Sequence, residues 1–75
     1  MRVRIEAVTD LHNKPKHSIL VGCERYVSIG RTMTMAGVGV ANRVHTSNVT
    51  KQEEKNGLIW VTTLNTIYVL KKLGI

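Results

Sequence analysis

The sequence has little that could crosslink it or hold a metal: one cysteine and three histidines, none with metal-site spacing. Cys23 alone cannot form an internal disulfide. A chain of 75 residues forms one domain, residues 1–75, and buries only about 60% of its unfolded surface, so its core is marginal. Because small domains are stabilised by disulfides, metals or oligomerisation, we expect a homo-oligomer without a cofactor.

Long apolar runs are also missing. No stretch approaches the roughly 18 apolar residues of a membrane span. The amino terminus, MRVRIEAVTD, alternates charged and apolar residues and lacks the apolar core of a signal peptide. We therefore expect a cytoplasmic protein that has no membrane partner.

Acidic residues are scarce. Five of them stand against eleven Lys and Arg, which gives a net charge of +6 and a pI near 10. This balance favours anionic partners, such as nucleic acid, nucleotide phosphates or an acidic protein surface. The acids lie outside apolar stretches, and the serines and histidines lack the nucleophile elbow of a hydrolase. We predict that the protein is not an enzyme.

Alternation of polar and apolar residues predicts β-strands along most of the chain. In residues 2–8 it places Val3, Ile5 and Ala7 on one face of a strand. Residues 10–17 contain the one proline and read as a loop, and residues 18–31 read as two short strands. In residues 32–44, Gly37 and Gly39 predict a bend within a strand.

The carboxy-terminal part predicts a hairpin. Asn56-Gly57 favours a type I′ turn, because both of its central residues need positive φ. In the strand that follows, one face carries Leu58, Trp60, Leu64, Tyr68 and Leu70, and the other carries Ile59, Val61, Ile67 and Val69. A strand that is apolar on both faces is buried on both, so the second face packs across a closed barrel or against another subunit. The sum is an all-β chain of about five strands, a small SH3-like or OB-like barrel.

Small hydrogen-bonding residues interrupt these last two strands. Such side chains, with arginine, recognise phosphates and ribose hydroxyls, so they form a candidate ligand site. The candidates are Arg43, His45, Thr46, Ser47, Thr63, Asn65, Thr66 and Tyr68, with Asn48 beside them. The alternative is that they form turns which cap strand ends, with Asn65 at a bend in the last strand.

A second hypothesis is a basic nucleic-acid-binding module. Its candidate residues are Arg2, Arg4, Lys14, Lys16, Lys71 and Lys72. The chain has three aromatic residues, and Trp60 and Tyr68 are expected in the core, so base stacking is not predicted. The hypothesis is binding through the phosphate backbone.

The carboxy-terminal third resembles a pattern in small accessory proteins of phages of Gram-positive bacteria. In that pattern an Arg-Thr-Ser-x-Val segment precedes a final Thr-x-Asn-Ser/Thr-x-Tyr strand. The matching residues here are Thr46, Ser47, Val49, Thr63, Asn65, Thr66 and Tyr68. The arginine departs from the pattern, because His45 directly precedes Thr46 and Arg43 lies two residues further back.

The resemblance implies a phage or mobile-element accessory protein in the host cytoplasm, similar in size and style to oligomeric phage proteins that counter host defence. We therefore expect capture of a small anionic ligand, such as a nucleotide immune signal, in a pocket between subunits. Nucleic-acid binding and inhibition of a host protein are the alternatives.

Overall fold

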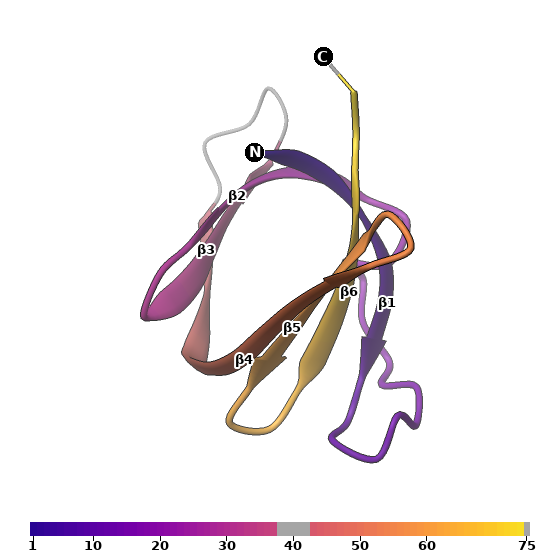
Figure 1. Ribbon diagram of the computed structural model, residues 1–75, viewed down its shortest axis with the longest axis vertical. Helices are drawn as coiled ribbons and strands as arrows, with labels where there is room; N and C mark the ends of the chain where they lie inside the picture. Colours follow the sequence, from indigo (N-terminus) through magenta and orange to yellow (C-terminus); the bar gives the residue numbers. More distant parts are fainter. Residues whose placement is uncertain (38–42, 75) are drawn as a thin grey trace.

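The computed structural model describes residues 1–37 and 43–74, which form a closed barrel of six antiparallel strands (Figure 1). The strands are β1 (Arg2–Thr9), β2 (Glu24–Ile29), β3 (Thr32–Gly37), β4 (Arg43–Lys55), β5 (Leu58–Thr63) and β6 (Ile67–Lys72). Each strand pairs with the next along the chain, and β6 pairs with β1 to close the barrel. The all-β prediction is confirmed, with six strands in place of about five. Residues 1–37 and 43–74 contain no helix long and apolar enough to cross a membrane.

The inward-facing side chains of β1, β2, β3, β5 and β6 form the buried core, and Val49 of β4 packs against it. Nine apolar residues make up the buried cluster: Val3, Ile5, Val8, Val27, Met33, Met35, Ile59, Val61 and Leu70. Met33 and Met35 are both fully buried, and their flexible side chains can fill irregular gaps in the core. The bend predicted at Gly37 and Gly39 falls partly outside the described residues, because Gly39 is not among them.

Because of a β-bulge, the residues of β1 that point into the core differ from those predicted. The register slips between Ile5 and Ala7 where β1 pairs with β6. Val3 and Ile5 point inward as predicted, but Val8 takes the third core position in place of Ala7. The extra residue of a bulge shifts the alternation by one, which a strict period of two cannot anticipate.

The connection between β1 and β2 is longer than predicted. Residues 18–31 contain one strand, β2, because residues 19–22 form a turn in which Gly22 adopts a φ of +85°. Leu20 packs against the core, whereas Ile19 is 86% exposed. At the start of this loop, the Asp10 carboxylate accepts hydrogen bonds from the backbone N–H groups of Lys14 and His12. These bonds lower the pKa of Asp10, the Lys14 N–H having the larger effect.

The two turns that flank β5 explain the carboxy-terminal pattern. The predicted Asn56-Gly57 turn is confirmed, with φ of +54° and +76°. The predicted single strand after it is wrong, because it is broken at residues 64–66 into β5 and β6. Leu64, expected in the core, is 61% exposed in this break.

The outer face of β5 and β6 is also apolar, but the predicted membership of the two faces is wrong after the break at residues 64–66, because Leu70 pairs with Ile59 on the inner face. Trp60, expected in the core, lies on the outer face. Trp60 lies opposite Val69 in the sheet, and Val69 lies opposite Ala7 of β1. Val69 is only 4% exposed although it lies outside the core cluster. Neighbouring side chains of the same chain therefore cover this face, and its apolar character does not by itself require another subunit.

Candidate functional site

The first group of candidate residues lies where β4 bends. β4 pairs with β3 in its first half and with β5 in its second, and Figure 1 shows the sharp bend between the two parts. Its register slips in both halves: two residues of β4 stand opposite Met33 of β3, and Thr50 is an extra residue between the pairs Val49–Thr63 and Lys51–Thr62 with β5. Bulges of this kind bend a strand and increase its twist. Thr46 and Ser47 occupy the first slip.

The Thr46 hydroxyl replaces a backbone hydrogen bond that is lost between β3 and β4 at this bulge. Thr46 Oγ1 accepts the backbone N–H of Met33 at 3.0 Å and donates to the Ser47 carbonyl at 2.8 Å. A side-chain oxygen thus replaces the carbonyl that the slipped register takes away from Met33. This arrangement supports the alternative interpretation for Thr46, a role in the fold.

The second group lies in the turn between β5 and β6. Thr63 is buried, and both its backbone N–H and its hydroxyl donate to the Thr66 carbonyl, at 2.8 and 3.1 Å. The Thr66 hydroxyl donates to Asn65 Oδ1 at 2.9 Å and accepts the ammonium of Lys16 at 2.9 Å. These polar groups bond one another and tie the β1–β2 loop to the turn.

Tyr68 stands next to this turn and packs against the core cluster. Burial raises the pKa of its phenol, and a hydrogen bond with the Thr66 side chain opposes that shift. Tyr68 therefore stays protonated at neutral pH and serves as a neutral side chain at the end of the barrel.

Arg43 and His45 lie apart from both groups, on the outer face of β4. Arg43 pairs with Ala36 and His45 with Thr34 across β3. His45 Nδ1 is 3.3 Å from Thr34 Oγ1. The eight candidates therefore occupy three places in the described chain and do not share one pocket. Whether any of them binds a ligand stays a prediction.

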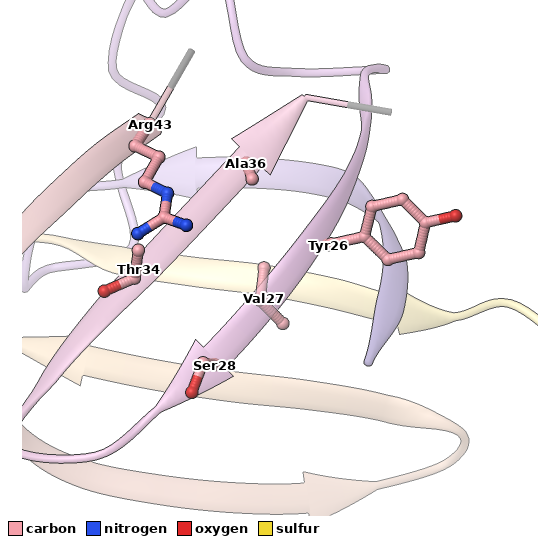
Figure 2. A pocket seen from close by; sticks show the side chains of 6 residues that line it. All are labelled: Tyr26, Val27, Ser28, Thr34, Ala36 and Arg43. Atoms are coloured by element: carbon pink, nitrogen blue, oxygen red, sulfur yellow. The ribbon is translucent and has the colours of Figure 1, made fainter. Parts of the chain in front are cut away.

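An open hollow of about 360 Å³ lies beside Arg43 on the outer face of β2 and β3 (Figure 2). Its lining residues are Tyr26, Val27, Ser28, Thr34, Ala36 and Arg43. In Figure 2 the Arg43 guanidinium lies beside Thr34, and the Tyr26 ring projects from the opposite rim. Tyr26 is 50% exposed, whereas Trp60 and Tyr68 are half-buried. The hollow thus offers a cation, hydroxyls and an aromatic ring on one face.

The ion pairs formed among the described residues leave out the arginine of this hollow. Among the described residues the ion pairs are Arg2–Glu24 and Arg4–Glu6 at 3.0 Å, Lys51–Glu53 at 2.8 Å and Lys72–Glu54 at 3.5 Å. None of these pairs includes Arg43. Three cations of the nucleic-acid hypothesis, Arg2, Arg4 and Lys72, are paired, and Lys16 is bound in the turn. Lys14 and Lys71 are exposed.

Sequence reasoning missed Tyr26, Ser28 and Thr34 as lining residues. The signal that could have found them is the alternation of inward and outward side chains along a strand. Tyr26 and Ser28 flank the buried Val27, and Thr34 lies between the buried Met33 and Met35. Alternation places them on an outer face, but only the register brings them beside Arg43.

The described residues include no group of three or more His, Cys, Asp or Glu that could hold a metal ion. A scan against protein-family models finds no match, and searches of curated proteins and of solved structures find no significant similarity to this chain. The geometry of the outer face therefore carries the functional argument.

Replacing Thr46 with valine tests the structural role of its hydroxyl. We expect a loss of about 1 kcal/mol in the free energy of unfolding, because the Met33 N–H loses its acceptor in a partly buried place. Urea unfolding measures the change. Ser47→Ala is the control, with an expected change within about 0.5 kcal/mol. Equal effects of the two substitutions would contradict this role.

Proposed function

We propose that this protein is a non-enzymatic module that binds a phosphate-bearing ligand with a base on the outer face of β2, β3 and β4. The single observation that carries the proposal is the guanidinium of Arg43, which forms no ion pair with a described residue and lies beside the Thr34 side chain in the hollow (Figure 2). Arginine offers five N–H donors in a planar fork that matches phosphate, and a hydroxyl adds one more donor. The net charge of +6 attracts such anions.

The exposed ring of Tyr26 supplies the second part of the recognition. Tyr26 and Arg43 lie on strands separated by β3, which places their backbones about 10 Å apart. A base stacked on Tyr26 and a phosphate held by Arg43 would lie at opposite rims of the hollow. Capture of a nucleotide immune signal, which the resemblance to phage accessory proteins implies, is one form of this proposal. It places the ligand on a face formed within one chain instead of between subunits.

Nuclear magnetic resonance titration with ATP as the probe tests the proposal. We expect shifts at the backbone amides of Ser28 and Thr34, and a roughly tenfold weaker affinity in Arg43→Ala, since a hydrogen bond to a charged group is lost. Arg31→Ala is the matched control, because Arg31 is also exposed but lies in the β2–β3 turn, outside the hollow. Equal losses of ATP affinity in both variants would show that net charge alone causes the loss. The absence of amide shifts at the hollow would overturn the proposal.

A further inference from the structure

We infer that the ligand of this face is single-stranded nucleic acid, which crosses the barrel along a row of outward residues from Arg2 to Arg43. The inference rests on the proposed function, since it uses the same hollow and names the class of ligand. It differs from the hypothesis drawn from the sequence, because it needs base stacking on Tyr26 and only one of the six cations named there.

The register of four adjacent strands makes this row. Arg2 of β1 pairs with Tyr26 of β2, Tyr26 with Ala36 of β3, and Ala36 with Arg43 of β4. At a strand spacing of about 4.8 Å, the backbones of the two arginines lie about 14 Å apart along the curved wall of the barrel. An arginine therefore stands at each end of the row, with an exposed ring and a small side chain between them.

The residues between the arginines leave room for a base. Ala36, which has a small side chain, pairs with Tyr26 in the row, and Tyr26 is 50% exposed. Ser28, Thr34 and His45 form the next row, where hydroxyls and an imidazole can bond sugar and phosphate oxygens. Stacking on an aromatic ring tolerates every base, because each base has a π-face.

The ion pair of Arg2 does not prevent its use. Arg2 and Glu24 bond at 3.0 Å with side chains 43% and 42% exposed. Exposed pairs of this kind contribute little to stability and are screened by salt. A phosphate can therefore replace Glu24 as the partner of the Arg2 guanidinium.

The openness of the hollow favours a strand over a free nucleotide. Sites for small molecules are concave and enclose most of the ligand surface. The outer wall of this barrel instead leaves one side of a bound nucleotide in water, whereas a strand gains contacts at Arg2, Tyr26 and Arg43 together. A duplex cannot use the ring, because its bases are stacked and paired inside the helix.

Fluorescence polarisation with a labelled twelve-nucleotide oligothymidylate tests this inference. We expect binding at low salt, weaker binding to a twelve-base-pair duplex, and competition by ATP only at much higher concentration. We expect Tyr26→Ala to weaken the oligonucleotide roughly tenfold and Tyr26→Phe to retain the affinity, since the ring performs the stacking. Arg2→Ala and Arg43→Ala should each make the slope of log affinity against log salt shallower by about 0.7.

The other outcomes distinguish failure of the inference alone from failure of the inference together with the proposed function. If ATP binds in an Arg43-dependent way and the oligonucleotide binds no tighter, the inference fails and the proposed function stands. If duplex and single strand bind equally and Tyr26→Ala has no effect, stacking is excluded and the inference fails. If neither probe binds the folded protein, both fail. Thermal unfolding of each variant confirms that the fold is intact.

Discussion

Replacing Ile5 with alanine is expected to lower the free energy of unfolding by about 2–5 kcal/mol. Ile5 is fully buried and pairs with Leu70 at the seam where β1 and β6 close the barrel. Removing its side chain loses buried apolar surface and leaves a cavity beside the β-bulge of β1. Small domains have a total stability of about 0.05–0.15 kcal/mol per residue, so this loss is a large part of the whole.

The matched control lies in the same chain. Ile19 is 86% exposed, so Ile19→Ala removes the same atoms from a side chain that contributes little burial. We expect it to change stability by less than about 0.5 kcal/mol. Urea unfolding followed by circular dichroism measures both variants. A loss in Ile5→Ala no larger than that in Ile19→Ala would contradict the assignment of Ile5 to the core.

The core of this barrel could be predicted where alternation was unbroken. Val3, Ile5, Ile59 and Val61 follow a period of two, and all four are buried. Asn56-Gly57 was predictable because few residue pairs accept positive φ at both central positions of a tight turn. Local chemistry alone determines features of this kind, so one sequence is enough to find them.

Features that depend on pairing between strands were not predictable. The bulge after Ile5 moves the core position from Ala7 to Val8, and no pattern in residues 2–8 predicts this bulge. The turn before Ile67 has neither proline nor glycine, and the hydroxyl of Thr63 stabilises it by bonding the Thr66 carbonyl. Threonine in a strand and threonine in such a turn look alike in a sequence.

The candidate site also has one feature that could be predicted from the sequence and others that depend on pairing between strands. The sequence predicted Arg43 as a ligand-binding residue; Arg43 lines the hollow, and its binding role stays a prediction. It grouped Arg43 with Thr63 and Thr66 because two strands that follow each other were expected to place them side by side. The bend of β4 instead turns Arg43 toward β3, so its neighbours across the sheet are Ala36 and, one row further, Thr34. Register, which the sequence does not state, determines which side chains meet.

Replacing Gly57 with alanine is expected to lower the free energy of unfolding by about 1–2 kcal/mol. Gly57 has a φ of +76° in the turn that joins β4 and β5, and a Cβ there would meet nothing within 4 Å. The expected loss is therefore backbone strain without any steric clash. Urea unfolding measures it, and hydrogen exchange of the β4 and β5 amides locates it.

Gly30→Ala is the matched control for this strain. Gly30 also lies in a hairpin turn with open space around a Cβ, but its φ is not positive. Alanine there restricts the unfolded chain without straining the folded one, so we expect unchanged or slightly higher stability. Equal effects of the two substitutions would show that the turn does not depend on positive φ at residue 57. A larger loss of stability in Gly57→Ala than in Gly30→Ala would connect this turn to the register between β4 and β5. That register places Ile59 and Val61 inside the barrel, because a slip of one residue would turn both side chains outward.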